Sequence, residues 1–247
     1  MVKLSKRMKA VAAMVSQGNV LCDVGTDHGY IPIALIQNKL ISKAIAMDIN
    51  QGPLERAKEH IGFYELGEYI ETRLSDGVAA LREGEADTIV VAGMGGELVI
   101  HILTEGEAVC RKVKELILQP QSDIWKVRRF LREHKYQIVD EDMVFEEGKY
   151  YPMMKVVPVE KDEMWEKINP DVIMPCDIYG PLLLRNGNPV LRRFLVNQHQ
   201  QFVSILKGLE KQDRTEAILK RIEEVKQQLA YNESAYCILG EMINAGI

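Results

Sequence analysis

Residues 21–30 read Leu-Cys-Asp-Val-Gly-Thr-Asp-His-Gly-Tyr (LCDVGTDHGY) and connect two apolar segments. The first, residues 19–24 (NVLCDV), has the short apolar run of a buried strand. The second, residues 30–40 (YIPIALIQNKL), has helical spacing, with Pro32 tolerated in the first turn. A strand, a glycine-bearing turn and a helix begin a nucleotide-binding α/β unit. The stretch therefore predicts a Rossmann-like core.

Two aspartates distinguish this turn from a dinucleotide-binding loop. A G-x-G-x-x-G loop brings backbone N–H groups to a pyrophosphate, whereas here Asp23 and Asp27 flank Gly25. Carboxylates repel phosphate and attract a cationic ligand. S-adenosylmethionine carries an ammonium, a sulfonium and no phosphate, and its carboxylate can accept hydrogen bonds from backbone N–H groups. In this loop we expect the methyl donor to be bound by Asp23, Gly25, Thr26, His28 and Gly29.

Strand and helix patterns alternate as far as about residue 160. Further strands are expected at 43–49, 69–77, 86–96, 114–120 and 136–160, the last folded as a hairpin around Glu147 and Gly148. Helices are expected at 51–66, 97–109 and 122–135. The alternation predicts an α/β fold with a parallel sheet, helices on both faces and an antiparallel strand on one edge.

The pattern changes after residue 160, where strand signals vanish. Asn188 and Pro189 are suited to begin a helix, and apolar residues then recur at helical spacing on both sides of a polar turn at 211–215. Two such helices form an antiparallel, coiled-coil-like hairpin. We therefore expect a methyltransferase domain at 1–160 and a helical domain at 161–247.

Three later motifs fall where the donor needs them. Asp48 lies 23 residues after Gly25, which suits an acid that accepts hydrogen bonds from the ribose hydroxyls. Asp76 and Gly77 follow the third strand, at the adenine edge of the site. Small residues after the fourth strand permit close approach of the backbone. The expected donor-binding set is completed by Asp48, Ile49, Asp76, Gly77, Gly93, Met94 and Gly95.

Composition narrows the class of protein. The 247-residue chain is 47% hydrophobic and 27% charged with a net charge of −5, and it has no apolar run of roughly 18 residues. Four widely separated cysteines suggest neither a zinc site nor a disulfide framework, and the histidines lack metal-ligand spacing. We expect a cytoplasmic protein without a metal or a membrane span.

The motifs DVGTDHGY (23–30), MDIN (47–50), SDG (75–77), AGMGGELV (92–99) and LILQPQSD (116–123) occur in this order. With the basic helix and helical hairpin that follow, the chain resembles the bacterial tRNA (adenine-22, N1)-methyltransferases, the TrmK-like family. The resemblance runs over nearly the whole chain. It implies a Rossmann-like methyltransferase core, S-adenosylmethionine as donor, and methylation of N1 of adenine 22 in the D-arm region of tRNA.

The residues after the fourth strand are compatible with ring-nitrogen chemistry. Enzymes that methylate exocyclic amines of adenine commonly carry Asn/Asp-Pro-Pro-aromatic there, whereas this chain has GMGG (93–96). N1 has an in-plane lone pair, so alignment and desolvation can replace a general base. The product ring is cationic, and we expect Asp27 to stabilise it; alternatively Asp27 holds the donor or caps the next helix. His28 either orients the donor or is structural.

A tRNA substrate requires phosphate contacts outside the pocket. Basic residues cluster near the N-terminus, in 111–135 and at the start of the hairpin, although such residues also simply keep a helix face solvated. Gln119 either reads a base edge or is a turn residue. The expected tRNA contacts are Lys6, Arg7, Lys9, Gln119, Lys126, Arg128, Arg129, Arg132, Arg192 and Arg193.

Two rival functions remain open at this stage: a methyltransferase acting on a small molecule or protein, and a non-catalytic RNA-binding protein that retains the donor fold. The basic segments and the long hairpin favour a macromolecular substrate. The hairpin can also pair two copies of the chain, although we expect a monomer.

Overall fold

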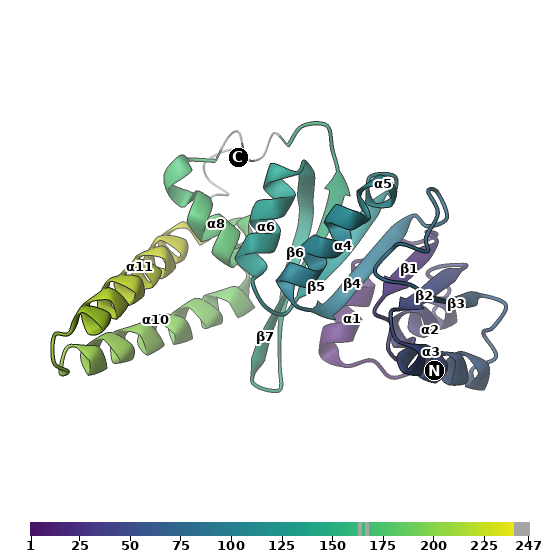
Figure 1. Cartoon of the computed structure of the whole chain (residues 1–247), viewed down its shortest axis with the longest axis horizontal. Coiled ribbons are helices and arrows are strands. Elements are labelled where there is room, and N and C mark those ends of the chain that lie inside the picture. The colour runs from purple at the N-terminus through teal and green to yellow at the C-terminus, as the bar shows by residue number, and fades with distance from the viewer. Residues whose placement is uncertain (163–164, 166–167, 240–247) are drawn as a thin grey trace. The chain divides into compact units, whose positions relative to one another are not determined.

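The computed structural model describes residues 1–162, 165 and 168–239 (Figure 1). The chain divides into two compact units, Met1–Asp162 and Glu163–Ile247. The first unit runs from purple to teal in Figure 1 and contains all the described strands. The second consists of helices.

Seven strands of the first unit form one sheet, in the order β3-β2-β1-β4-β5-β7-β6. Neighbours from β3 to β5 pair in parallel, and β7 is antiparallel to both β5 and β6. The edge strand is β6, so the antiparallel strand lies one place inside the expected edge. The strands are β1 (Leu21–Val24), β2 (Ala44–Asp48), β3 (Ile70–Leu74), β4 (Thr88–Met94), β5 (Glu115–Pro120), β6 (Tyr136–Glu146) and β7 (Lys149–Pro158).

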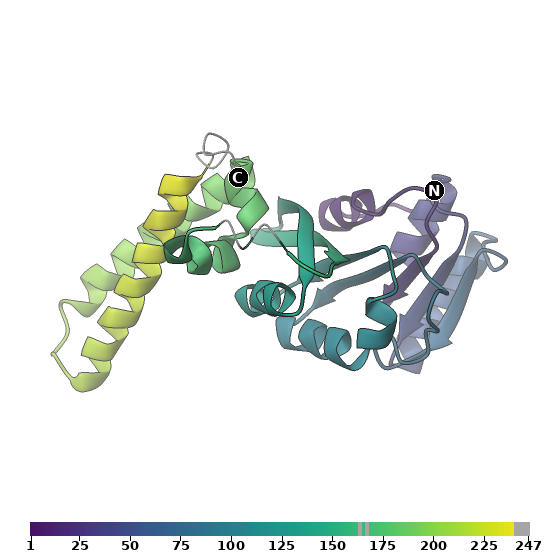
Figure 2. The same ribbon diagram turned by 90° about the horizontal axis from the view of Figure 1, so that it is seen from above.

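Helices cover both faces of this sheet, which confirms the α/β fold. The first three pack into one apolar cluster on a single face, and Figure 2 shows α4 and α6 on the face opposite α1. The helices are α1 (Lys6–Ala13), α2 (Tyr30–Gln37), α3 (Gln51–Phe63), α4 (Gly96–Glu105), α5 (Glu107–Cys110) and α6 (Ile124–Glu133).

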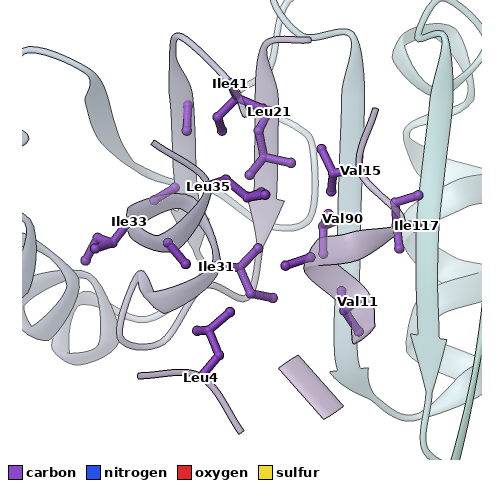
Figure 3. Close-up of a cluster of buried hydrophobic side chains, with 14 of the residues drawn as sticks. Leu4, Val11, Val15, Leu21, Ile31, Ile33, Leu35, Ile41, Val90 and Ile117 are labelled. Atoms are coloured by element: carbon purple, nitrogen blue, oxygen red, sulfur yellow. The ribbon is translucent and has the colours of Figure 1, made fainter. Parts of the chain in front are cut away.

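A hydrophobic core lies between α1, α2 and the central strands. Leu21, Val90 and Ile117 project from β1, β4 and β5 towards Val11 and Ile31 (Figure 3). Every residue of β1, β2 and β5 is buried, because helices cover both faces of a parallel sheet. This core fixes the ends of β1 and β4, where the candidate site lies.

The second unit confirms the helical hairpin. Its elements among the described residues are a 3₁₀ turn (Pro170–Val172), α8 (Ile173–Tyr179), α9 (Pro181–Arg185), α10 (Pro189–Leu209) and α11 (Glu216–Ile238). The Asn188 side chain accepts hydrogen bonds from the N–H groups of Val190 and Leu191 and so caps α10. Asn232 of α11 is buried and donates to the Leu195 carbonyl, which fixes the register of the two helices. No helix among the described residues is both long and apolar enough to span a membrane.

A buried ion pair joins α6 to the edge strand. Arg128 Nε donates to Glu141 Oε1 over 2.8 Å, and the two side chains are 1% and 0% exposed. Arg128 therefore serves the packing of α6 on β6. The expectation that Arg128 contacts tRNA is wrong, because a guanidinium inside the core cannot reach a phosphate.

We predict that Arg128→Ala lowers the free energy of unfolding by about 3–5 kcal/mol, because it leaves the Glu141 carboxylate buried without its partner. Arg129→Ala on the same helix is the matched control. Arg129 is exposed and forms a surface ion pair with Glu133, so its loss should change stability by less than about 1 kcal/mol. Urea unfolding measures both values, and equal losses would contradict the prediction.

Candidate active site

The candidate site lies where the order of the parallel strands reverses: β2 and β3 are added on one side of β1, and β4 and β5 on the other. β1 and β4 are neighbours at this switch point, and ligands of open α/β sheets bind beyond the carboxyl ends of such strands. A pocket of about 310 Å³ opens there. It is lined by Arg7, Met8, Val11, Asp23, Gly25, Thr26, Asp27, His28, Tyr30, Ile31, Ala92, Gly93 and Gln121.

The loop after β1 is shaped by one carbonyl of the neighbouring strand. The N–H groups of Gly25 and Thr26 both donate to the Met47 oxygen, over 2.8 and 3.0 Å. The Gly29 N–H donates to the Thr26 oxygen over 3.0 Å. These three N–H groups already have partners within the chain. We expected the loop backbone to bind a carboxylate of the ligand, but these three groups are not available for that contact.

Gly25 is favoured by its backbone conformation. Its φ is +72°, and a Cβ at this position would lie 2.2 Å from the Met94 Cε. The Met94 side chain thus passes directly over the loop. The positive φ explains why a glycine follows β1.

Asp23 is the buried acid of the pocket. Its side chain is 4% exposed, and Oδ2 accepts a hydrogen bond from Thr26 Oγ1 over 2.7 Å. Burial raises the pKa of Asp23 to about 6; the Thr26 hydrogen bond opposes this shift, and the charge of Asp48 adds to it. The pocket therefore holds a carboxylate that an incoming cation would stabilise.

Asp27 is the exposed acid at the rim. It has a φ of +47°, and its side chain is 54% exposed. Oδ1 accepts from Arg56 Nη2 over 2.5 Å, and Oδ2 lies 3.3 Å from His28 Nε2. α3 thereby orients Asp27, because Arg56 belongs to that helix.

Three stacked rings hold the same loop against α3. His28 stacks on Tyr30 and on His60, with ring centroids 5.0 and 5.3 Å apart. His60 Nδ1 also lies 3.1 Å from the His28 carbonyl oxygen. These contacts of His28 fit a structural role in the loop, and a role in orienting the donor stays a prediction.

Glycines line the opposite wall at the end of β4. Gly93 has a φ of +83°, and a Cβ there would approach Arg7 Nη1 to 3.3 Å. Gly95 is the N-cap residue of α4, and a Cβ on Gly96 would lie 2.4 Å from the Ser122 oxygen. This wall therefore approaches α1 and the loop after β5 too closely for larger residues.

Gln119 lies beneath Arg7 and is completely buried. Its Oε1 accepts a hydrogen bond from Arg7 Nη1 over 2.8 Å, and its Nε2 donates to the Pro120 carbonyl. The expectation that Gln119 reads a base edge is wrong, because neither polar atom faces solvent. Its visible role is to orient Arg7.

The remaining expected donor residues lie on the neighbouring strands. Asp48 is buried at the end of β2, where Oδ1 accepts from the Asn50 N–H over 2.8 Å, and Ile49 beside it is exposed. Asp76 and Gly77 line a second cavity, of about 400 Å³, against α4. The structure thus gathers the residues of the β1 loop in one pocket and places these two in another.

The expected tRNA contacts differ in their surroundings. Lys6 and Lys9 are exposed on α1, and Arg192 and Arg193 are exposed in the first turn of α10. The others lie on α6: Lys126 pairs with Glu97 and Asp123, Arg129 pairs with Glu133, and Arg132 is half-buried.

Two residues at the rim escaped the sequence analysis. Arg56 and His60 both reach the loop after β1 from α3. Their spacing of four residues puts them on one face of a helix, which is the signal that could have paired them. Nothing in the sequence indicated that this face meets Asp27 and His28. No group of three or more potential metal ligands occurs among the described residues.

Comparisons with known proteins agree with this geometry. A family model described as a methyltransferase domain matches residues 4–154. The tRNA (adenine(22)-N(1))-methyltransferase of Bacillus subtilis (strain 168) is 32% identical over 227 residues, which cover 92% of this chain and 94% of the relative.

Solved structures extend the likeness to the second unit. The B. subtilis m1A22 tRNA methyltransferase TrmK is 31% identical, with a TM-score of 0.83 over 96% of this chain and 100% of its own. The Streptococcus pneumoniae protein Sp1610, a putative tRNA (m1A22) methyltransferase in complex with S-adenosyl-L-methionine, is 31% identical, with a TM-score of 0.78 over 95% and 100%. Since the likeness spans both units, this chain belongs to the bacterial tRNA (adenine(22)-N(1))-methyltransferase family.

Proposed function

We propose that this protein transfers a methyl group from S-adenosylmethionine to N1 of adenine 22 in the D-arm region of tRNA. The observation that carries the proposal is the 32% identity to the B. subtilis enzyme across 92% of the chain. The pocket at the β1–β4 switch point supplies the site. Its substrate would place the enzyme in the cytoplasm, and we propose that it acts as a monomer.

The residues of the pocket fit a cationic donor without phosphate. Asp23 and Asp27 supply carboxylates for an ammonium, and the positive φ values of Gly25 and Gly93 favour glycine at these two positions of the pocket. Asp48, at the end of β2, is suited to bind the ribose hydroxyls, with Ile49, Asp76 and Gly77 on the adenine side. When bound, the donor supplies an electrophilic methyl group.

The target adenine needs positioning more than a general base. N1 offers its lone pair to the methyl group directly, so the pocket has to align the base and exclude water. The purine gains positive charge as the methyl group arrives and loses it when a proton leaves N6. Asp27 at the rim is our candidate for stabilising that charge.

Exposed and half-buried cations outside the pocket are proposed to hold the tRNA by its phosphates. In the first unit these are Lys6 and Lys9 of α1 and Lys126, Arg129 and Arg132 of α6; in the second they are Arg192 and Arg193. Such contacts set register without reading sequence. Their contribution should weaken as salt is raised.

Transfer of a labelled methyl group to tRNA transcripts tests the function. The protein is incubated with S-adenosylmethionine and an unmodified tRNA carrying adenine 22, and with the same tRNA carrying guanine 22. Digestion and mass spectrometry should reveal 1-methyladenosine only in the first. Binding of S-adenosylhomocysteine without transfer to either tRNA would favour a small-molecule or protein substrate.

We predict that Asp27→Asn lowers the single-turnover rate by about 100-fold, because the cationic ring loses a nearby charge. Affinity for S-adenosylhomocysteine should fall much less. Glu83→Gln removes the same charge from an exposed site in the first unit and is the control. A parallel loss of rate and affinity in Asp27→Asn would instead assign Asp27 to donor binding.

We predict that Asp23→Asn raises stability while weakening donor binding. The pKa of Asp23 in the folded protein, about 6, lies above its ordinary value of 3.8, so the ionisation of Asp23 destabilises the fold as pH rises through 6. At pH 8 the variant should unfold at a higher temperature than the wild type, and the difference should shrink as pH falls below 6. It should also bind S-adenosylhomocysteine more weakly at pH 8.

Calorimetry checks both parts of this prediction. Scanning experiments at pH 8 and pH 5 give the unfolding temperatures, and titrations at pH 8 give the affinities. An unfolding temperature at pH 8 that does not rise, or an affinity that does not fall, would contradict the role assigned to Asp23.

A further inference from the structure

We propose that Gln121 reads the target adenine through paired hydrogen bonds to N6 and N7. The assignment rests on the proposed function and names the side chain that selects its base. Gln121 directly follows β5, is exposed, and lines the pocket at the β1–β4 switch point. Its side-chain amide has no hydrogen-bond partner among the residues that the structure describes. The amide is therefore available to a bound base.

A bulge in the sheet lies beside Gln121. The pairing of β4 with β5 shifts register between Ala92 and Met94, which leaves Gly93 as an extra residue. Bulges re-aim neighbouring side chains and are common beside active sites. The Gln121 backbone N–H donates to the Met94 carbonyl over 2.8 Å, and a Cβ on Gly93 would lie 3.8 Å from Gln121 Nε2. The amide thus lies against the β4 wall of the pocket.

Other polar side chains of this pocket are bonded within the protein. Arg7 Nη1 donates to the buried Gln119 Oε1 over 2.8 Å, and Thr26 Oγ1 donates to Asp23 Oδ2 over 2.7 Å. A glutamine amide carries one acceptor and two donors in a single plane. Gln121 therefore brings to the pocket a donor and an acceptor that a base edge can match together.

The reaction leaves one suitable edge of adenine for this amide. N1 forms a bond to the methyl carbon, the bond from that carbon to sulfur breaks, and sulfur keeps the electron pair. The edge that carries N1 must therefore face the donor. N6 and N7 lie on the adjoining edge, and a glutamine amide matches them by accepting from N6 and donating to N7. Guanine would instead place its O6 acceptor opposite the Gln121 oxygen.

The GMGG segment (93–96) at the end of β4 contributes no polar side chain to hold the amino group of adenine. Enzymes that methylate exocyclic amines of adenine commonly carry Asn or Asp at the start of this segment. Gln121 supplies an amide at the same wall from the neighbouring strand β5. This arrangement would hold N6 by a hydrogen bond and leave N1 free to react.

Methyl transfer to two matched tRNAs tests the proposal. One carries adenosine at position 22, and the other carries 7-deazaadenosine, which replaces N7 by a C–H group and keeps N1 and the amino group. Single-turnover rates with the full chain compare the wild type, Gln121→Leu and the control Gln17→Leu. Gln17 is an exposed glutamine that precedes β1, at the opposite end of that strand from the pocket.

Gln121→Leu should methylate the adenosine tRNA about 10- to 100-fold more slowly than the wild type, the range expected for loss of a two-point base contact. The ratio of the adenosine rate to the 7-deazaadenosine rate should be larger in the wild type than in Gln121→Leu by about fivefold, the effect of one hydrogen bond. Comparing ratios removes the difference in intrinsic reactivity between the two bases. Gln17→Leu should behave as the wild type does.

Gln121→Glu gives a second test with a sign of its own. Its carboxylate can still accept from N6 but faces N7 with an acceptor instead of a donor. We expect the ratio of the adenosine rate to the 7-deazaadenosine rate to fall below that of Gln121→Leu. Thermal unfolding establishes that each variant is folded, and titration calorimetry should show affinities for S-adenosylhomocysteine within about threefold of the wild type.

Two results would overturn the assignment while leaving the proposed function intact. Equal rate ratios in the wild type and both Gln121 variants would mean that Gln121 does not contact N7. A loss of affinity for S-adenosylhomocysteine as large as the loss of rate would assign Gln121 to the donor. Absence of transfer by the wild type to either tRNA, with S-adenosylhomocysteine still bound, would overturn the proposed function and this assignment together.

Discussion

The carbonyl of Met47 is the constraint on which the site depends. By accepting from both Gly25 and Thr26, it fixes where the chain leaves β1 and turns towards α2. Asp23 is consequently held inside the pocket, and Asp27 is held at its rim. The parallel pairing of β1 with β2 puts that carbonyl in place, so the chemistry of the loop follows from the register of the sheet.

Segments that lie far apart in the sequence bring opposite charges to the pocket. The acids come from the loop after β1, the oriented cation from α1, and the support for the exposed acid from α3. Each segment reaches the carboxyl end of the sheet by a different route. An α/β sheet makes this possible because its helices pack beside the strands whose loops form the site.

The sequence predicted the alternating elements and the residues of the β1 loop because both are local patterns. It did not predict the burial of Arg128, although Ile124, Val127, Arg128 and Leu131 share one helical face. Charge alone suggested solvent, and the partner Glu141 lies on another element. The prediction for Gln119 was wrong and the prediction for Arg7 was incomplete for the same reason. The two residues are in contact although they lie 112 positions apart in the chain.

The buried pair between α6 and β6 also bears on how the molecule responds to heat. Charged groups lose part of their hydration free energy as temperature rises, so withdrawing Arg128 and Glu141 from water becomes less unfavourable on warming. Apolar contacts gain no comparable advantage, since their stabilisation per unit area levels off. The ion pair that joins α6 to the edge strand β6 therefore contributes relatively more to stability, compared with apolar contacts, as the temperature rises.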